Sequence, residues 1–240
     1  HDFLPDGSIV VCTMQGDIWR VAGVDDELAN LRWRRIAAGL HQPLRLLVVD
    51  GTIHVLGRDQ ITRLHDTNDD GEIDRYECFS RAYATSPGGH DYVMGLERDA
   101  EGRFLTASSN QGLLRISADG QSVDVLATGL RNPDGLGITP SGLITAASSE
   151  GDWVPASLIA AVAPWHSGSP PHFGHGGLRN SQPPALPLVY LPRGEDNSSG
   201  GQVWCPEGAM GPLGGHSVHL SFGTGTAFLI LEDEVGGQLQ

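Results

Sequence analysis

The sequence predicts an all-β protein built from repeated units of short antiparallel strands. Its 240 residues include 33 Gly and 15 Pro, a content that indicates many turns between short strands. Several segments repeat one pattern: an apolar residue, a polar turn with Gly, an alternating strand, a second turn and another strand. The glycines of these turns lie at positions 7, 51, 102 and 142, so their spacing of about 40–50 residues matches a propeller blade.

We therefore expect a β-propeller rather than a β-sandwich, whose turns would recur about every 8–12 residues without the longer period. Each unit buries one sheet face only by stacking on the next, and apolar residues such as Trp19, Ile53 and Phe104 would fill these interfaces. Residues 1–240 are expected to form a single partial propeller domain of about four to five blades. Blade starts are expected near residues 3, 46, 95, 135 and 218.

The expected strand pairs follow this order along the chain. In each pair apolar and polar residues alternate on either side of a Gly-containing turn, which favours strands with one buried face. The segments are 3–11 with 16–21, 47–55 with 60–64, 96–105 with 112–116, 136–144, and 219–223 with 227–231. The Gly- and Pro-dense stretch 165–187 is expected to be a long irregular connection.

Charge and composition exclude several classes of function. The formal net charge is −14, from 29 acidic and 15 basic residues without a clustered basic patch, which argues against nucleic acid as a partner. All the basic residues are arginine, so lysine chemistry such as Schiff-base formation is excluded within this segment. No apolar run approaches the roughly 18 residues of a spanning helix, so we expect no membrane insertion here. The chain begins at His1 without a signal peptide and is expected to be a fragment of a longer polypeptide.

Residues 66–77 carry the strongest chemical signal. They read DTNDDGEIDRYE and fill the slots of the twelve-residue calcium loop, in which oxygen ligands alternate along the chain and Gly71 makes the sharp turn. The flanking segments have the pattern of strands rather than helices, so a bound Ca²⁺ would stiffen a connection rather than act as a sensing switch. The alternative is a solvated acidic turn without metal. The candidate metal ligands are Asp66, Asn68, Asp70, Glu72, Asp74 and Glu77.

Two polar constellations precede predicted blade-start strands, where propeller ligands bind at the axial mouth. His90 follows two glycines and precedes Asp91, and a histidine pKa near neutrality suits a general base, although most histidines serve structural hydrogen bonds. Arg131 and Asn132 offer a guanidinium fork and an amide suited to a planar anion. The alternative for the second constellation is a tight turn locked by Pro133 and a following glycine.

Two further polar clusters have less specific spacing. Residues 149–155 place Glu150 and Asp152 in a loop after the fourth expected blade start, where they could contact a metal or a substrate. Residues 193–202 form a dense polar loop whose default interpretation is hydrogen-bonded turns.

These blocks together resemble the glucose/sorbosone dehydrogenase superfamily of six-bladed propellers. The similarity rests on His90 with the Gly95-Leu96 pair, the block 129–136, the block 149–151, and the blocks 58–66 and 196–202. The last two are similar to the dehydrogenase-like bacterial branch that is abundant in Planctomycetes. The resemblance covers nearly the whole chain, which would then be a partial six-bladed propeller.

The resemblance implies a division of roles. His90 would take the proton of a sugar hydroxyl, and Arg131 and Asn132 would contact pyrroloquinoline quinone (PQQ). A separate Ca²⁺ would polarise the quinone carbonyl. The implied partners are a small sugar or alcohol substrate and, in the parent chain, a cytochrome c domain; the implied location is extracytoplasmic, either periplasmic or secreted.

Three functions remain open at this point. The first is a quinone- and calcium-dependent sugar or polyol dehydrogenase that passes electrons to a cytochrome. The second is a non-catalytic, calcium-stabilised propeller that acts as a glycan- or protein-binding scaffold. The third is a metal-dependent, lactonase-like hydrolase whose metal would be held by Glu150, Asn132 and Asp91.

Overall fold

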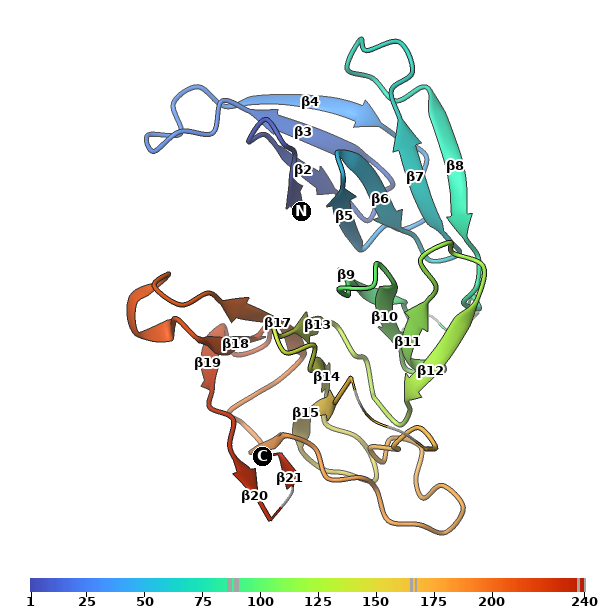
Figure 1. The fold of residues 1–240 in the computed structure, drawn as a ribbon, viewed down its shortest axis with the longest axis vertical. Coiled ribbons are helices and arrows are strands. Elements are labelled where there is room, and N and C mark those ends of the chain that lie inside the picture. Colours follow the sequence, from blue (N-terminus) through green and yellow to red (C-terminus); the bar gives the residue numbers. More distant parts are fainter. Residues whose placement is uncertain (86–87, 89–90, 165, 167, 237, 240) are drawn as a thin grey trace. The chain divides into compact units, whose positions relative to one another are not determined.

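The computed structural model describes residues 1–85, 88, 91–164, 166, 168–236 and 238–239. Within these residues the secondary structure is almost entirely β, and one short 3-10 turn, η1 (Gly211–Leu213), is the single helical element. In this described part of the chain no helix has the length and apolarity that spanning a membrane requires. The all-β prediction is therefore confirmed (Figure 1).

The chain forms two compact units. The N-terminal unit comprises residues 1–86 and 119–122, and the C-terminal unit comprises residues 87–118 and 123–240. In both units each sheet is an antiparallel meander of consecutive strands, which is the strand pattern of a propeller blade.

The N-terminal unit contains two four-stranded sheets. The first consists of β1 (Asp2–Phe3), β2 (Ile9–Cys12), β3 (Ile18–Ala22) and β4 (Arg32–Ala37), and the second of β5 (Arg45–Val49), β6 (Thr52–Leu56), β7 (Ile61–His65) and β8 (Arg75–Ser80). β5 packs against β1 and β2, and buried aliphatic side chains of both sheets form one core. The outer strand β4 is exposed over its first four residues, as its run of arginines predicts.

The repeated glycines occupy turns that require them. Gly7, Gly51, Gly102 and Gly142 have φ angles of 82°, 79°, 80° and 83°, a region that is strained for other residues. Each lies between the first and second strand of one of the first four sheets. The repeat seen in the sequence therefore corresponds to a repeated turn with positive φ at the same place in each sheet.

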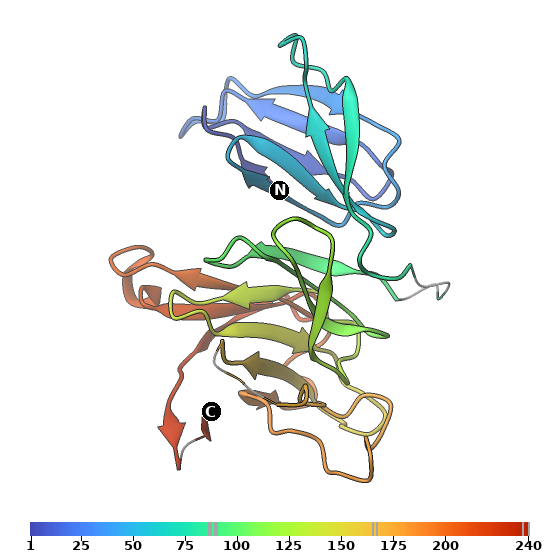
Figure 2. The ribbon, with the colours of Figure 1, turned by 45° about the vertical axis from the view of Figure 1, so that its right-hand side comes forward.

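The C-terminal unit contains three further sheets and a terminal hairpin (Figures 1 and 2). The third sheet consists of β9 (Met94–Arg98), β10 (Phe104–Ser108), β11 (Gly112–Ile116) and β12 (Val123–Ala127). The fourth consists of β13 (Leu136–Ile138), β14 (Ile144–Ser148), β15 (Ser157–Val162) and β16 (Val189–Leu191). The fifth consists of β17 (Ser199–Cys205), β18 (His216–Ser221) and β19 (Thr226–Ile230), and the hairpin of β20 (Glu234–Val235) and β21 (Gln238–Leu239).

The first four sheets begin close to the expected positions, and the fifth does not. Its first strand is β17, so the segment from residue 218, marked by the sequence pattern as a blade start, belongs to the second strand. The register shifts between Ser199 and Gln202. Two glycines fill this irregularity and hide the alternation that would have marked β17 as a strand.

Gly135 brings the fourth and fifth sheets into close contact. A Cβ atom built on Gly135 would lie 2.3 Å from Gly201 Cα and 2.5 Å from Gly201 N. β13 packs against β17 and also against β9. Because the two backbones nearly touch at Gly135, the end of the connection before β13 lies beside the first residues of β17.

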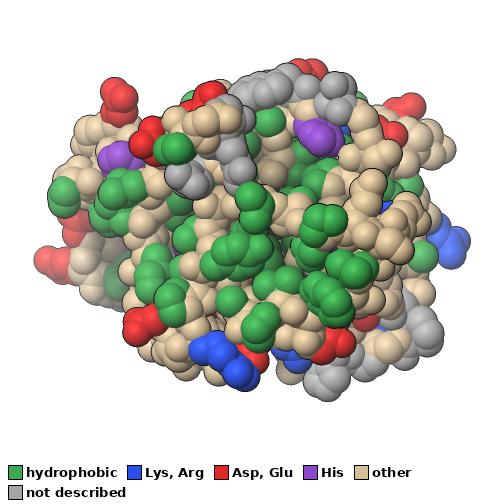
Figure 3. Space-filling view, turned by 90° about the horizontal axis from the view of Figure 1, so that it is seen from below, with side chains coloured by type: hydrophobic (Ala, Val, Ile, Leu, Met, Phe, Trp, Pro, Cys, Tyr) green, Lys and Arg blue, Asp and Glu red, His purple; other side chains and the backbone are tan. Residues whose placement is uncertain are grey.

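Two other features of the C-terminal unit concern its surface. The connection between β15 and β16 spans residues 163–188, as its Pro content predicts, and is anchored by Phe173, which is 2% exposed. Hydrophobic side chains of the fifth sheet and of the turn after β18 remain exposed, among them Val203, Leu220 and Phe222. Figure 3 shows hydrophobic side chains gathered on the face of the molecule seen from below.

Candidate functional site

One cavity of the C-terminal unit gathers polar side chains from several strand connections. Its volume is about 470 Å³. It is lined by Arg131, Asn132, Ser149, Glu150, Ser157, Arg193, Gly194, Asp196, Asn197, Ser198 and Thr224. Two guanidinium groups, two carboxylates, two amides and several hydroxyls therefore converge, which is the composition of a binding site for a polar ligand.

Arg131 and Asn132 are fixed by hydrogen bonds on both sides of their peptide bond. The Arg131 amide donates to Ser148 Oγ at 2.8 Å, and the Asn132 amide donates to Ser109 Oγ at 2.8 Å. Arg131 Nη1 donates to the backbone carbonyl of Glu150. Asn132 has a φ of 41°, a left-handed conformation that asparagine tolerates better than most residues. The hydrogen bonds that form this turn therefore also hold Arg131 and Asn132 in place at the cavity.

Glu150 connects the two arginines of the cavity. Its carbonyl accepts from Arg131, and its carboxylate accepts from Arg193 Nε at 3.0 Å and from Arg193 Nη2. The side chains of Arg193 and Glu150 are 69% and 39% exposed, so the pair contributes at most about 1 kcal/mol to stability. Its effect is geometric and electrostatic: Arg193 is held at the cavity rim and its charge is compensated by Glu150, whereas Arg131 donates to the carbonyl of Glu150 and forms no ion pair with the described residues.

Asp196, which lines the cavity, lies next to a buried histidine, His219. Asp196 and His219 have fully buried side chains, and His219 Nε2 lies 3.4 Å from Asp196 Oδ1. Burial lowers the pKa of His219 despite the neighbouring carboxylate. Burial opposes ionisation of Asp196, but hydrogen bonds from serine hydroxyls and the proximity of His219 outweigh it and leave the pKa of Asp196 below its ordinary value. The pair is therefore a neutral imidazole next to an ionised carboxylate.

Asp134 lies in the same connection as Arg131, and its pKa is shifted in the opposite direction to that of Asp196. Burial raises the pKa of Asp134 to about 6. The protonated acid is favoured in the folded state, so the stability that this group provides is fully present below pH 3.8 and is lost as the pH rises through about 6.

Replacing Asp134 with asparagine is expected to remove this pH dependence. We expect Asp134→Asn to raise the free energy of unfolding by about 1–2 kcal/mol at pH 8, because the variant no longer has to bury a charge, and to leave it unchanged at pH 4. Urea unfolding of both proteins at the two pH values measures this. A gain of equal size at pH 4 would contradict the assignment, because it would reflect packing rather than ionisation.

The predicted base His90 lies outside the described residues, as does the adjacent Gly89. Asp91 is described: it is 9% exposed and accepts hydrogen bonds from the backbone amide and the side-chain amide of Asn110. Glu150 and Asn132 line the cavity, but Asp91 is not among its lining residues. The three residues proposed for a lactonase-like metal site therefore do not all line this cavity.

The predicted calcium loop connects β7 to β8 in the N-terminal unit. Asp66 Oδ2 accepts from the Gly71 amide at 2.7 Å, while Asp66 Oδ1 is buried and has no hydrogen-bond partner among the described residues. Asp70 Oδ1 accepts from the Glu72 amide at 2.8 Å. Asp74 Oδ2 accepts from the Thr67 amide at 2.8 Å. The segment 66–74 is therefore a closed loop in which carboxylates already bind backbone amides.

Glu77, the last residue of the calcium pattern, lies in β8 rather than in the loop. Its Oε2 is 2.7 Å from His65 Nε2, and this hydrogen bond is the main reason that the pKa of Glu77 is lowered. Across the described part of the chain, no three His, Cys, Asp or Glu side chains are grouped closely enough to hold a metal ion. His65 pairs with Arg75, so the loop ends at Asp74. Glu77 lies three residues further along, in β8, and is not part of the loop.

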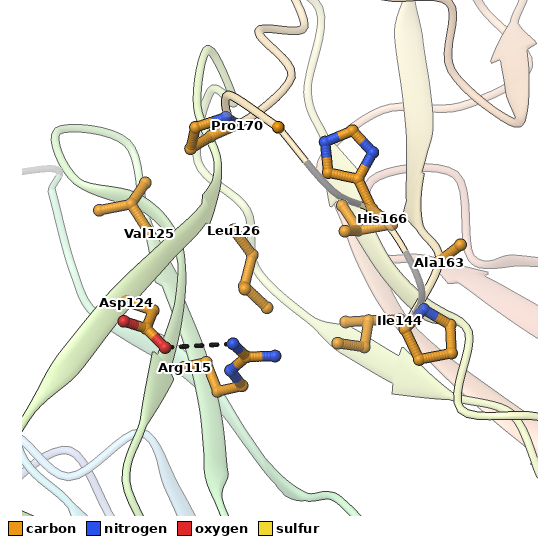
Figure 4. Close-up of a pocket in the computed structure, with 11 residues that line it drawn as sticks. Arg115, Asp124, Val125, Leu126, Ile144, Ala163, His166 and Pro170 are labelled. Atoms are coloured by element: carbon orange, nitrogen blue, oxygen red, sulfur yellow. Dashed lines mark hydrogen bonds and ion pairs between the residues drawn. The ribbon is translucent and has the colours of Figure 1, made fainter.

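A second cavity of the C-terminal unit, about 380 Å³ in volume, is less suited to a polar ligand (Figure 4). Its walls include the aliphatic side chains of Leu126 and Ile144, and its charged groups are the ion pair between Arg115 and Asp124, whose atoms are 3.1 Å apart. Convergent polar groups are fewer here than in the first cavity. The cavity that contains Arg131 is therefore the candidate functional site.

Sequence reasoning found one side of this site and missed the other. Arg131, Asn132 and Glu150 were singled out, and the structure brings them together. The loop 193–202 was interpreted as turns, yet five of its residues line the cavity. Ser157 and Thr224 gave no signal, because isolated hydroxyl residues at strand ends are common. His219 was read only as part of an alternating strand.

Sequence comparison finds no matching family model and no matching curated relative. Comparison of structures does find similar folds. An oxidoreductase from Thermus thermophilus assigned as a glucose dehydrogenase is 16% identical, with a TM-score of 0.71 over 100% of this chain and 80% of the other. The PQQ-bound aldose sugar dehydrogenase of Streptomyces coelicolor is 14% identical, with a TM-score of 0.67 over 100% of this chain and 79% of the other.

The soluble aldose sugar dehydrogenase of Escherichia coli, in its apo form, is 12% identical, with a TM-score of 0.63 over 100% of this chain and 83% of the other. At these identities the likeness concerns the fold alone. The resemblance inferred from the residues agrees with it. The chain therefore has the fold of the glucose and aldose sugar dehydrogenase propellers.

Proposed function

We propose that this chain is part of a six-bladed, quinone-dependent sugar or polyol dehydrogenase that passes electrons to a cytochrome and works outside the cytoplasm. The observation that carries the proposal is the cavity in which Arg131 and Asn132 meet the polar segment 193–198. The resemblance had assigned these two residues to PQQ, and the fold agrees with that of a PQQ-bound sugar dehydrogenase.

The residues of the cavity suit a planar, oxygen-rich anion. The guanidinium of Arg131 donates to a neutral carbonyl, that of Glu150, and Asn132 and Asn197 add amides. These side chains would hold the carboxylates and carbonyls of PQQ. When bound, the quinone supplies a hydride acceptor for the alcohol carbon, and His90 is the residue expected to take the hydroxyl proton.

Calorimetric titration of PQQ into the full-length parent protein, with Ca²⁺ present and then chelated, tests the proposal. We expect binding that requires Ca²⁺ and weakens at least tenfold in Arg131→Ala, because a charge-assisted hydrogen bond of about 1.5–3 kcal/mol is lost. Arg98→Ala is the matched control, since Arg98 lies on β9 and donates to Gly102 rather than lining the cavity. Equal binding by Arg131→Ala and the wild type would exclude this cavity as the quinone site.

One observation favours the second candidate, a glycan- or protein-binding scaffold. Arg193 is compensated by Glu150, and Asp196 adds a second negative charge, so the two arginines of the cavity face two carboxylates. A cavity without net positive charge is a weaker attractor for a tricarboxylate than for a neutral polar ligand. A folded parent protein that binds sugars but not PQQ would select the scaffold.

We also propose that the loop 66–74 binds Ca²⁺ as a structural ion. Its ligands would come from Asp66, Asn68, Asp70, Glu72 and Asp74. The unpartnered, buried Asp66 Oδ1 supports it, because a hard cation would satisfy that oxygen. The engagement of Glu77 by His65 argues that the twelfth ligand is dispensable.

Calcium affinity is therefore expected to depend on one end of the loop. We expect Asp66→Ala to weaken Ca²⁺ binding at least a hundredfold and Glu77→Gln to change it by less than threefold. Titration calorimetry with Ca²⁺, together with thermal melts before and after chelation, measures both. A large loss of Ca²⁺ affinity in Glu77→Gln would show that Glu77 is a ligand and that the full twelve-residue set holds the ion. Absence of Ca²⁺ binding by the wild type would show that the loop is an acidic turn without metal.

A further inference from the structure

Residues 169–185, within the long connection between β15 and β16, line a cavity of about 450 Å³. This cavity shares no lining residue with the cavity that contains Arg131, so it is a separate feature of the C-terminal unit with no role in the proposed function. Three prolines and one alanine form its apolar wall. Its polar wall consists of Ser169, His172, Arg179, Asn180 and Gln182.

Backbone hydrogen bonds fix this connection to the end of β12. The Thr128 amide donates to the Pro171 carbonyl at 2.9 Å, and the Phe173 amide donates to the Thr128 carbonyl at 2.8 Å. His172 thereby forms a parallel bridge with Thr128. The His172 carbonyl accepts from the Ala185 amide at 2.7 Å, which holds the two ends of the lining segment together. The walls of the cavity therefore have a defined position before any ligand binds.

A tight turn brings Arg179 and Gln182 side by side. The Gln182 amide donates to the Arg179 carbonyl at 3.0 Å, and the two residues form an antiparallel bridge. Between them Asn180 and Ser181 have φ angles of 52° and 59°, the left-handed pattern of a type I′ turn. Residues opposite each other in an antiparallel pair place their side chains on the same face. The side chains of Arg179 and Gln182 are therefore neighbours in the cavity wall.

A chain of side-chain hydrogen bonds fixes one edge of the Arg179 guanidinium. His172 Nε2 lies 2.8 Å from the Gly177 carbonyl, and because a carbonyl only accepts, this nitrogen carries a proton. In the neutral imidazole Nδ1 then accepts, so the Thr128 hydroxyl donates to it at 3.0 Å. Thr128 Oγ1 in turn accepts from Arg179 Nη1 at 2.8 Å. The Nε and Nη2 atoms of Arg179 donate to no described residue and remain for a ligand.

The charge of Arg179 is not compensated in the described part of the chain. Arg179 forms no ion pair there, and no acidic side chain is among the described residues that line the cavity. Arg193 differs, because Glu150 pairs with it. The side-chain amides of Asn180 and Gln182 also have no hydrogen-bond partner among the described residues. In a chain of formal net charge −14, this cavity is therefore a local positive site with neutral donors beside it.

We propose that this cavity binds a sugar acid, a polyhydroxy compound with one carboxylate. Arg179 would bind the carboxylate, and Thr128 is a positioning residue that holds the guanidinium. The edge formed by Nε and Nη2 matches the two oxygens of a carboxylate, and one positive charge balances a monoanion better than a phosphate dianion. The amides of Asn180 and Gln182 and the Ser169 hydroxyl suit the hydroxyl groups of the ligand. The prolines offer rigid apolar surface to its C–H groups.

Titration calorimetry of D-gluconate into the full-length parent protein tests this proposal. We expect Arg179→Gln to weaken binding about tenfold or more, because the charged fork is lost while the glutamine amide can still donate to Thr128. Arg179→Lys keeps the charge but not the planar fork, and should weaken binding about threefold or more. Arg98→Gln is the matched control: it removes the same charge from β9, outside the cavity, and should bind as the wild type does.

Thr128→Val tests the positioning role. Valine has nearly the shape of threonine without the hydroxyl, so the charge of Arg179 stays but loses its anchor. We expect binding to weaken about threefold and to keep the salt dependence of the wild type, because the same charge is still present. In Arg179→Gln the affinity that remains should no longer fall as salt is added. A merely structural role would lower thermal stability without separating the two variants in this way.

The outcomes separate this inference from the proposed function. Loss of gluconate affinity in Arg179→Gln but not in Arg98→Gln supports the inference. Unchanged gluconate affinity in Arg179→Gln overturns it, as does absence of gluconate binding by the wild type or tighter binding of inorganic phosphate. A loss of equal size for D-glucose also overturns it, because the carboxylate would then not be what Arg179 binds. None of these results bears on the dehydrogenase proposal, which the PQQ titration decides independently.

Discussion

Replacing His219 with leucine is expected to lower the free energy of unfolding of the C-terminal unit by about 3 kcal/mol at pH 7.5. The side chain of Asp196 is 0% exposed, and His219 is one of the few groups that stabilise its charge. Removing the neutral imidazole takes a hydrogen-bond donor away from a buried carboxylate, which typically costs about 1–3 kcal/mol and more when the acceptor is charged. Leucine fills a similar volume, so the loss would report electrostatics rather than a cavity.

The same variant should show how stability depends on pH. The pKa of Asp196 is lowered in the folded protein, so its contribution is present above pH 3.8 and is lost as the pH falls through the folded pKa. The pKa of His219 is also lowered, so its contribution is present above pH 6.5 and is lost in acid. The lowered pKa of His219 therefore predicts that the difference between wild type and His219→Leu is largest above pH 6.5 and shrinks toward pH 4, whereas the contribution of Asp196 is still present at pH 4.

Urea unfolding followed by circular dichroism at pH 7.5, 5.5 and 4 measures this difference. His41→Leu is the control, because His41 is half exposed and its ion pair with Asp59, at 3.6 Å, is expected to contribute less than about 1 kcal/mol. A loss in His219→Leu that is the same at all three pH values would mean that packing, not the charge of Asp196, dominates at this position.

The buried pair also shows where sequence reasoning ends. The periodic glycines predicted the first four sheets because each marks a turn with φ near 80°, a conformation that glycine adopts far more readily than other residues. Arg131 and Asn132 were predictable because a single turn fixes both. The hydrogen bond between Asp196 and His219 joins a residue before β17 to a residue in β18, and no local sequence pattern predicts such a contact.

The calcium loop illustrates a related limit. Its spacing predicted a turn with inward-facing carboxylates, and Gly71, with a φ of 84°, makes the sharp bend. The fate of Glu77 was decided by strand pairing: once His65 pairs with Arg75, Glu77 belongs to β8 and meets His65 instead of the loop. The motif records ligand types, whereas the register of the sheet determines which of them can converge.

Gly135→Ala is expected to have the other large effect, on stability and on the site together. The added Cβ would lie within 2.3–2.5 Å of backbone atoms of Gly201, and backbone cannot rotate away as a side chain can. Overpacking of this kind costs about 1–3 kcal/mol and occasionally more, so we expect a loss of about 3 kcal/mol in the free energy of unfolding. Chemical unfolding at neutral pH provides the measurement.

Gly201→Ala is a matched control for the same contact. A Cβ on Gly201 meets nothing within 4 Å, and Gly201 is not among the glycines with positive φ, so alanine should be tolerated there. We expect a change of at most about 1 kcal/mol, in either direction, because alanine also restricts the unfolded chain. The two variants add the same methyl group to facing backbones and differ only in its direction.

The consequence for function follows from the position of Gly135. Arg131 and Asn132 precede β13, and the segment 193–198 precedes β17, so a methyl group that separates the two strands widens the cavity between its two walls. Ligand affinity measured on the fraction that remains folded should therefore fall in Gly135→Ala and persist in Gly201→Ala. If Gly135→Ala lost stability but kept full ligand affinity, the close approach of β13 and β17 would serve the fold alone. The shape of the cavity would then depend on the hydrogen bonds of Arg131 to Glu150 and Ser148.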